Sequence, residues 1–301
     1  MTTRISFISC LSLLFFGIVT SVHATVSLGG LGTGTVESYP AGIDCPATCT
    51  SVFTQDSTVT LSATPDSGFA FDGWSGGSCN GNADCTETMD RDYNITATFN
   101  ADIDGDGISD TMERDGPNGG DANNDGVLDA VQHYVTSYRN IYGVYVTLVI
   151  PSEHRLTTAT FQGNPSPVDT PQNVGFGAGF LGFTIQGITT GGSTTLTIIA
   201  HGNYEITSYY KYGPTPGDSS NHWYEFLYNG ETGAQIDLND SQARTILHLT
   251  DGSLGDDDLT ANGSITDIGG PVTKWDDTEP DDTETNVQSS GGCFVSTLIN
   301  E

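Results

Sequence analysis

The stretch from Asp102 to Gln132, DIDGDGISDTMERDGPNGGDANNDGVLDAVQ, decides how this chain is organised. It contains one twelve-residue pattern twice, with acidic or amide residues at positions 1, 3, 5, 9 and 12 and a glycine at position 6. The first copy consists of Asp102, Asp104, Asp106, Gly107, Asp110 and Glu113, and the second of Asp121, Asn123, Asp125, Gly126, Asp129 and Gln132.

Alternating oxygen donors followed by a glycine are typical of a calcium loop. Calcium prefers about six to eight oxygen ligands, and position 7 contributes a backbone carbonyl, here from Ile108 and Val127. The alternative is a solvated acidic linker, because runs of charge are usually exposed. Nine acids and one arginine lie between Asp102 and Asp129, however, and they repeat in phase. Folding them without a counter-ion would place like charges side by side, so we expect bound calcium.

The flanks of the two loops indicate which kind of calcium repeat this is. No long amphipathic helix borders them, so a helix–loop–helix site is not expected. The stretch instead resembles the thrombospondin type 3 class of calcium repeat, in which the chain winds around ions with little other core. Gln132 replaces the usual closing acid, so we expect the second site to be weaker.

The composition excludes one class of partner. Lys and Arg number 8 against 38 Asp and Glu, which gives a formal net charge of −30. Nucleic acid is therefore not a natural partner, because its phosphates would be repelled. Small and polar residues dominate and helix formers are scarce, as in β-rich extracellular proteins.

Residues 1–24 are predicted to be a signal peptide. Arg4 provides a positive start, residues 5–19 are apolar, and Val22-His23-Ala24 forms a cleavage box. The apolar run is too short to span a membrane comfortably, and no other segment could span one. We expect an exported protein, extracellular or on the cell surface, without a transmembrane segment after processing.

Five cysteines remain once Cys10 is removed with the signal peptide. The close spacing of Cys45 with Cys49 and of Cys79 with Cys85 predicts two local disulfides in an oxidising compartment. A zinc site is the competing interpretation, but the spacings are not those of a zinc motif. Cys293 is left over and is a candidate reactive or anchoring position.

Residues 25–100 are predicted to form a small β domain, with alternating segments at 33–37, 58–63, 68–74 and 93–99. The sequence GTVESYPAGIDCPATC, followed by VTLSATPDSGFAFDGWSG, ADCTETM and NITATF, resembles the divergent internalin-type B-repeat of bacterial surface proteins. The resemblance covers about 70 residues and implies a structural spacer without catalytic residues.

One segment of this domain, Gly73-Trp74-Ser75-Gly76-Gly77, matches the GxSxG nucleophile elbow. That motif needs a strand-to-helix turn in a mainly parallel sheet. Here it lies in a disulfide-flanked turn of an all-β domain, so we favour a structural role with Trp74 in the core. The HExxH motif is absent as well, and we do not expect an enzyme.

Residues 101–134 are assigned to the calcium-binding segment, and residues 135–272 to an antiparallel β-sandwich. Alternation predicts eight strands, at 143–150, 156–161, 179–187, 194–201, 203–212, 221–228, 234–238 and 243–250. The sequences YKYGPTP, HWYEFLY and LTDGSLGDDDLTANGSITDIGGP resemble the choice-of-anchor U domain, which precedes variable surface-anchoring tails. With NGGDANNDGVLDAVQ, the resemblance covers about 150 residues and implies no established enzymatic role.

Two groups of residues in the sandwich have alternative interpretations. Aromatic residues concentrate between residues 204 and 228, and they either stack on sugar rings or, as we favour, belong to the core. The candidates for glycan contact are Tyr209, Tyr210, Trp223 and Tyr224. A second oxygen-rich group could hold a further cation, or could simply form a glycine-punctuated turn. It consists of Asp251, Asp256, Asp257, Asp258, Asn262 and Asp267.

Residues 273–301 are predicted to be an acidic, disordered tail. It ends in Ser290-Gly291-Gly292-Cys293-Phe294-Val295, which resembles the start of a C-terminal sorting box of the CFI-box type. The hydrophobic helix and basic stop of anchoring tails do not follow this box.

The sequence therefore predicts a mainly β protein: a small N-terminal β domain, a calcium-loop linker and a C-terminal antiparallel β-sandwich. We expect a non-enzymatic, exported bacterial surface or extracellular protein whose modules are joined by a calcium-rigidified segment. Its expected partners are calcium ions, with surface glycans or cell-envelope components as further candidates. A carbohydrate- or surface-binding adhesin using residues 204–228 is the alternative, and a secreted hydrolase is the least favoured reading.

Overall fold

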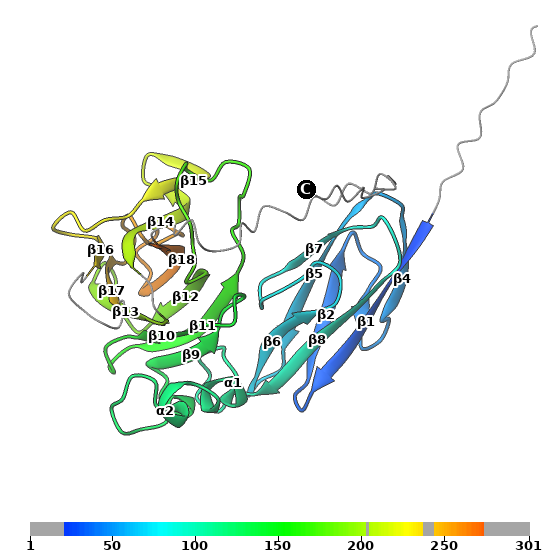
Figure 1. Ribbon diagram of the computed structural model, residues 1–301, viewed down its shortest axis with the longest axis horizontal. Coiled ribbons are helices and arrows are strands. Elements are labelled where there is room, and N and C mark those ends of the chain that lie inside the picture. The colour runs from blue at the N-terminus through cyan, green and yellow to red at the C-terminus, as the bar shows by residue number, and fades with distance from the viewer. Residues whose placement is uncertain (1–20, 203–204, 237–243, 274–301) are drawn as a thin grey trace, which may run out of the picture.

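The computed structural model describes residues 21–202, 205–236 and 244–273. Figure 1 shows two β modules that meet at the acidic segment, where the short helices α1 (Asp110–Arg114) and α2 (Pro117–Gly120) lie. The prediction of a mainly β fold is confirmed. Most of the predicted signal peptide and the acidic tail with Cys293 lie outside the described residues.

The N-terminal module consists of two four-stranded sheets packed face to face. The first has the order β4 (Thr50–Thr54), β1 (Ser21–Gly30), β8 (Tyr93–Ala101) and β6 (Phe69–Ser75). The second has the order β3 (Asp44–Cys45), β2 (Gly34–Tyr39), β5 (Thr58–Pro65) and β7 (Cys85–Thr88). Alternate residues of β1, β5 and β8 face inward, and their apolar side chains fill the space between the sheets.

The predicted disulfides Cys45–Cys49 and Cys79–Cys85 are both present. Ser75, the serine of the GxSxG match, is the last residue of β6 and pairs with Thr96 of β8. Trp74 is buried in the module core, and its indole nitrogen donates to the carbonyl of Ala83. This part of the chain is thus a strand followed by the disulfide loop, as the structural interpretation requires.

Strand β1 begins earlier than the cleavage-box pattern suggests. Ser21 to Ala24, which that pattern places in the signal peptide, pair with β4 from Thr54 to Ser51. Val22 and Ala24 are buried in the module core. The reason is that the alternation of small apolar residues continues backward from Val26, so these residues satisfy a strand pattern as well as a cleavage pattern.

The C-terminal module is a sandwich of two five-stranded antiparallel sheets. One has the order β16 (Gly233–Ile236), β17 (Arg244–Thr250), β13 (Ser193–His201), β10 (Tyr145–Val149) and β9 (Val135–Arg139). The other has the order β11 (Arg155–Gln162), β12 (Phe180–Gln186), β18 (Ser264–Thr273), β14 (Ile206–Thr215) and β15 (Asp218–Glu225). Strands β9 and β18 were not among those that alternation predicts.

The acidic segment packs against the C-terminal module and follows the N-terminal module without a spacer. Asp102 comes directly after β8, and its backbone nitrogen donates to the carbonyl of Gly68 at 3.0 Å. Ile108 belongs to the core of the C-terminal sandwich, and Met112 packs against that core. A segment anchored at both ends in this way couples the two modules.

A second connection between the modules is the loop closed by the Cys79–Cys85 disulfide. Asn82 of this loop lies beside the free edge of β11, like a short extra strand. Its backbone nitrogen donates to the carbonyl of Phe161 at 3.2 Å, and its side-chain oxygen accepts from the nitrogen of Phe161 at 2.8 Å. The side-chain nitrogen donates to the carbonyl of Ala159 at 3.1 Å. The loop therefore covers backbone groups that an edge strand would otherwise expose.

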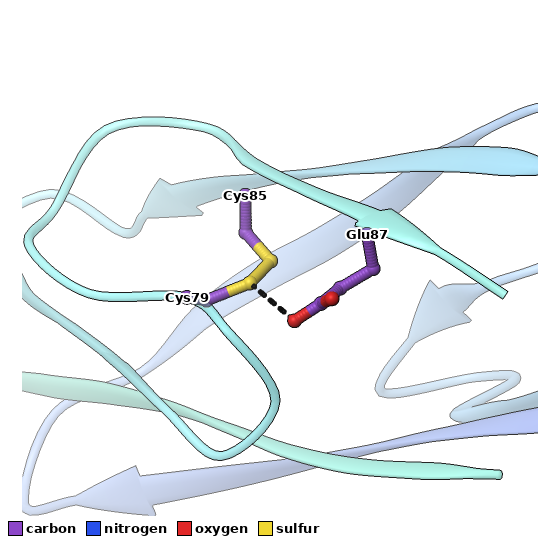
Figure 2. Close-up of side chains that lie close together, drawn as sticks. All are labelled: Cys79, Cys85 and Glu87. Carbon is purple, nitrogen blue, oxygen red and sulfur yellow. Dashed lines mark hydrogen bonds between the residues drawn. A yellow bond between two sulfur atoms is a disulfide. The ribbon is translucent and has the colours of Figure 1, made fainter. Parts of the chain in front are cut away.

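Figure 2 shows how the disulfide loop is held on its other side. Glu87 of β7 is buried, and its carboxylate accepts a hydrogen bond from the backbone nitrogen of Ser78. The same carboxylate lies 3.3 Å from the sulfur of Cys79. Cys79, Cys85 and Glu87 cluster as metal ligands would, but the sulfurs are consumed in the disulfide, so we assign this group a structural role.

We expect Asn82→Ala to weaken the docking of the two modules. It removes both side-chain hydrogen bonds and leaves groups of β11 unsatisfied, which should lower the free energy of unfolding by about 1–3 kcal/mol. Denaturant unfolding measures the change. Asn80→Ala is the matched control, because Asn80 is an exposed residue of the same loop. Equal effects of the two substitutions would contradict this role of Asn82.

Candidate metal centre

The first acidic loop is folded by its own backbone around Asp102. The two carboxylate oxygens of Asp102 accept hydrogen bonds from the nitrogens of Gly105 at 2.6 Å and Gly107 at 3.1 Å. Both glycines have positive φ angles, 72° and 97°, which other residues rarely adopt. A side chain at Gly107 would also meet the backbone nitrogen of Ala159 at 2.9 Å. The glycine at position 6 is therefore required by both the turn and its contact with β11.

This turn directs three carboxylates toward one point. Oxygen atoms of Asp102, Asp104 and Asp106 all lie within 4.8 Å of one another. Two oxygens that share a calcium ion at about 2.3–2.6 Å can be at most about 5 Å apart, so the spacing suits a common ion. The alternation of ligand residues thus produces a compact oxygen cluster in the folded chain.

Several oxygens of this cluster and of the neighbouring Glu113 are buried and accept no hydrogen bond from any described residue. They are both carboxylate oxygens of Asp104, Oδ2 of Asp106 and Oε2 of Glu113. Asp106 and Glu113 are both 0% exposed. A buried carboxylate oxygen without a donor is costly, and a cation is the usual way to satisfy several at once.

Glu113 reaches the cluster because helix α1 begins where it does. The hydroxyl of Ser109 caps the helix by accepting from the nitrogen of Met112 at 3.3 Å. Glu113 then lies on the buried side of this short helix, and its Oε1 accepts from the nitrogen of Ser137 in β9 at 3.3 Å. Its other oxygen is left for the cluster, as the closing position of a calcium loop requires.

The ionisation behaviour of the cluster reflects its burial and its crowding. Burial, together with the nearby charge of Asp102, raises the pKa of Asp104 to about 7. Burial and the charges of Asp106 and Asp104 raise the pKa of Glu113 to about 11. Burial and the charge of Asp104 also raise the pKa of Asp106. Without a cation, these groups resist ionisation at neutral pH.

Two predicted ligands of this loop have other roles as well. Asp110 is buried, and its oxygens accept from the nitrogen of Ile103 at 2.8 Å and from Arg114 at 3.1 Å. The side chain of Ile108 is committed to the sandwich core. Asp110 therefore connects the start of the loop to helix α1 through hydrogen bonds. The buried side chain of Ile108 holds in place the backbone carbonyl that the pattern assigns to the ion.

The second loop also turns around its first aspartate, but its carboxylates receive more hydrogen bonds from side chains. Asp121 accepts from the nitrogens of Asp125 and Gly126, both at 3.0 Å, as Asp102 does in the first loop. Here, however, the exposed Asp125 receives amide donors from Asn123 at 2.9 Å and from Gln132 at 2.9 Å. The hydrogen bond from Gln132 lowers the pKa of Asp125. These carboxylates are thus satisfied within the loop, and Val127 at position 7 is exposed.

Two residues of the second loop, however, turn toward the interior. Asp129, at the start of the short 3-10 helix η1 (Asp129–Val131), is fully buried, and its Oδ2 accepts from the nitrogen of Ala122 at 3.2 Å. Its Oδ1 and the buried Oε1 of Gln132 have no donor among the described residues. The charge of Asp129 contributes to the raised pKa of Glu113, so the two loops share one acidic interior.

Sequence reasoning did not identify Ser137, which organises this interior from β9. Its nitrogen donates to Glu113 and its hydroxyl to Asp129. The hydroxyl also lies 2.8 Å from that of Thr147 in β10, which lies 2.8 Å from Nε2 of His201. The available signal was a serine directly after the acidic segment, in the sequence VTSYR, but alternation alone does not reveal what a polar strand residue contacts.

The candidate glycan contacts lie mostly inside the sandwich or in a packed aromatic cluster. Tyr209 is fully buried in the main core, which excludes it from a binding surface. Trp223 stacks on Phe176 at 5.5 Å and contacts Phe180 and Tyr212 edge-on or tilted. Tyr210 packs in the same cluster, and Tyr224 packs against the main core. The faces that would stack on a sugar are therefore used by neighbouring side chains.

The second oxygen-rich group separates into two parts. Asp251 accepts backbone donors from Gly191, Asn262 and Gly263, and Asp256 accepts from Gly252 and Thr266. Asp258 accepts from Thr260 and Asn262. These acids form turns, in agreement with the glycine-punctuated alternative. Asp257 and Asp267 instead face a buried lysine.

We expect the chelator-treated protein to lose stability as the pH rises from about 5 to about 8. The folded pKa of Asp104, about 7, lies above its ordinary value of 3.8, and that of Glu113 lies above 4.5. Between the two values the folded chain binds more protons than the unfolded chain, so the free energy of unfolding falls with pH. Thermal unfolding in chelator measures this. Glu113→Gln should flatten the dependence, and an unchanged slope would contradict the assignment.

Comparison with known proteins identifies one region of the chain. Residues 32–103 match the family model of the divergent InlB B-repeat domain. This region spans most of the N-terminal module and ends within the first acidic loop. No curated protein and no solved structure matches the chain. A divergent InlB B-repeat domain is typical of bacterial surface or extracellular proteins, and residues 32–103 are similar to such a domain.

Proposed function

We propose that this protein is a non-enzymatic, exported bacterial surface protein whose two β modules are locked together by calcium in the loop from Asp102 to Glu113. The observation that carries the proposal is the set of buried carboxylate oxygens of Asp104, Asp106 and Glu113 that have no donor in the described chain. Helix α1 and strands β8 and β9 hold these oxygens in place. A cation at their centre supplies the positive charge that the fold itself lacks there.

The chemistry of the donors favours calcium over other ions. Each candidate ligand is a carboxylate or carbonyl oxygen, which hard cations prefer, whereas zinc and copper sites use nitrogen or sulfur. The loop offers several carboxylates in a flexible turn, and this suits calcium better than magnesium, which keeps most of its water. Calcium is abundant outside cells, so a site of modest affinity is filled there.

The position of the loop gives the ion a mechanical role. Asp102 continues β8 of the N-terminal module, while Ile108 is part of the C-terminal core. Arg155 of β11 donates to the carbonyl of Asp104 and so holds the middle of the loop against the sandwich. An ion that fixes this loop also fixes the direction in which one module leaves the other, and its binding energy adds to the stability of the junction.

The second loop is proposed to bind calcium more weakly. Its Asp125 is exposed and is already neutralised in part by the amides of Asn123 and Gln132. An ion there would have to displace these donors, and an amide at the closing position contributes no charge. The oxygens of this loop that remain available to a cation are the buried Oδ1 of Asp129 and Oε1 of Gln132, which accept no hydrogen bond from the described residues.

The proposed location outside the cell agrees with two findings. The divergent InlB B-repeat domain is typical of surface proteins, and the module contains two disulfides, which persist in oxidising compartments. Within the ranges that the structure describes, no helix is long and apolar enough to cross a membrane. The packed state of Trp223 and Tyr209 gives the adhesin alternative little support.

Calcium should raise the unfolding temperature of the wild-type protein. The gain follows the ratio of free ion to dissociation constant, and is about 2.7 kcal/mol at one hundred times that constant. Glu113→Gln should abolish most of this gain and, in chelator, should stabilise the protein, because a glutamine does not have to take up a proton when it is buried. Asp115→Asn is the matched control, because Asp115 is an exposed acid of the same segment outside the pattern.

Calorimetric titration of the chelator-stripped protein provides the direct measurement. Binding heat that is lost in Glu113→Gln and kept in Asp115→Asn is the expected result. A wild-type unfolding temperature that is the same in calcium and in chelator would rule out the proposed lock.

A further inference from the structure

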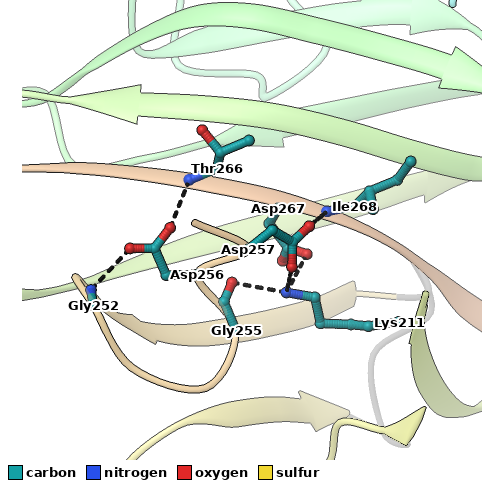
Figure 3. A network of polar contacts seen from close by, with 8 residues as sticks. All are labelled: Lys211, Gly252, Gly255, Asp256, Asp257, Thr266, Asp267 and Ile268. Carbon is teal, nitrogen blue, oxygen red and sulfur yellow. Dashed lines mark hydrogen bonds and ion pairs between the residues drawn. The ribbon is translucent and has the colours of Figure 1, made fainter. Parts of the chain in front are cut away.

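A lysine is buried in the interior of the C-terminal sandwich. Lys211 of β14 is 0% exposed, and its side chain points between the sheets, as alternate residues of the strand do. Lys211 pairs with Gly269 of β18, so Asp267, two residues away on the same strand, faces the same side. Asp257 approaches from the loop that precedes β18, and Figure 3 shows the three side chains converging.

The Lys211 ammonium contacts the carboxylates of Asp257 and Asp267 in different ways. Its Nζ donates to the carbonyl of Gly255 at 2.8 Å and to Oδ1 of Asp257 at 3.0 Å. It lies 2.6 Å from Oδ1 of Asp267, yet neither oxygen of Asp267 accepts a hydrogen bond from the described part of the chain. Since a carbonyl bond is about 1.2 Å long, the carboxyl carbon of Asp267 lies within about 4 Å of the nitrogen.

The surroundings exclude water and make this charge arrangement expensive. The rings of Phe226 and Tyr224 lie 5.3 Å and 5.9 Å from Nζ. Asp267 has a fully buried side chain, and that of Asp257 is 16% exposed. Two acids face one base, so the ionised group carries an excess negative charge in the core. A buried ion pair gains little net stability, because both members lose their hydration.

We propose that Lys211 and Asp267 condense into an intramolecular amide bond that covalently joins β14 to β18, with Asp257 transferring the proton. An amine and a carboxyl group held in contact, shielded from water and beside a second carboxylate are the parts that such a condensation needs.

The reaction balances without any further reagent. Asp257 takes one proton from the Lys211 ammonium, and the neutral amine adds to the carboxyl carbon of protonated Asp267. The tetrahedral intermediate loses its hydroxyl group as water, which takes up a second proton from the nitrogen. One carbon–nitrogen bond forms, one carbon–oxygen bond breaks, and no electron is gained or lost. The products are one amide, one water molecule and protonated Asp257.

The electrostatics of the site agree with these roles. Burial raises the pKa of Asp267 to about 7, despite the opposing charge of Lys211, so its reactive protonated form is present near neutral pH. Burial also raises the pKa of Asp257, which makes it a better proton acceptor. Burial lowers the pKa of Lys211, but the charges of Asp267 and Asp257 outweigh it and raise the pKa overall. The resting state is therefore an ion pair, and the reaction requires the proton transfer to Asp257.

Positioning and burial favour a condensation that does not proceed in water. Groups held in reactive contact react as if present at about 10⁵–10⁸ M, which lowers the barrier to condensation. Condensation also replaces two buried charges by a neutral amide and releases water to the solvent. Strands β14 and β18 are already neighbours in the sheet, so the bond forms without a change of register.

Tryptic digestion of the reduced, denatured full chain tests the proposal, because trypsin cleaves after a free lysine but not after an acylated one. We expect Lys211 to resist cleavage. A branched product should appear in which residues 156–244 are joined to residues 245–274, with a mass lower by one water than the sum of the two peptides.

Three variants separate the roles of the residues. Lys211→Arg and Asp267→Ala should each restore cleavage at position 211 and remove the branched product. Asp257→Asn keeps both reacting groups, so it should fold and show a smaller joined fraction that grows slowly with time. Circular dichroism checks that each variant is folded. Complete cleavage after Lys211 when the folded wild-type protein is denatured and digested, with residues 156–211, 212–244 and 245–274 all at their sequence masses, would overturn the proposal.

Discussion

Burial of like-charged carboxylates at the junction of two β modules is the constraint on which this structure depends. Asp102 leaves the last strand of one module, and Ile108 enters the core of the other, so the acids between them cannot move out into solvent. Their oxygens converge because glycines allow the chain to reverse there. The junction therefore either keeps some of these acids protonated or holds a cation, and the proposed calcium ion changes the first state into the second.

The same chain manages buried acids in two different ways. At the junction, no described lysine or arginine reaches the oxygens of Asp104 or Glu113, so compensation has to come from outside the protein. In the sandwich core, Asp257 and Asp267 face Lys211, which the chain supplies itself. The first arrangement makes stability depend on the ion content of the surroundings. The second arrangement, with the proposed amide bond, would make the stability of the sandwich independent of the ions in the surroundings.

Both proposed arrangements would strengthen the connection between the two modules. The disulfide loop places Asn82 on the edge of β11, and the first acidic loop contacts the same strand through Gly107 and Arg155. Strand β11 is thus contacted at two points, once by the disulfide loop of the N-terminal module and once by the acidic segment. A bond between β14 and β18 would secure the sheet to which β11 belongs.

The sequence by itself determined what depends on local pattern: the mainly β class, the two short-range disulfides, and the loops that alternate acids with glycine. It could not determine contacts between residues far apart in the chain. Ser137 between Glu113 and Asp129, and Lys211 opposite Asp267, are produced by strand register and sheet packing, which alternation does not encode. For the same reason, only the tertiary structure decided that the acidic segment packs against the sandwich, with Ile108 in its core. Burial depends on the residues that pack around a side chain, and these are distant in the sequence.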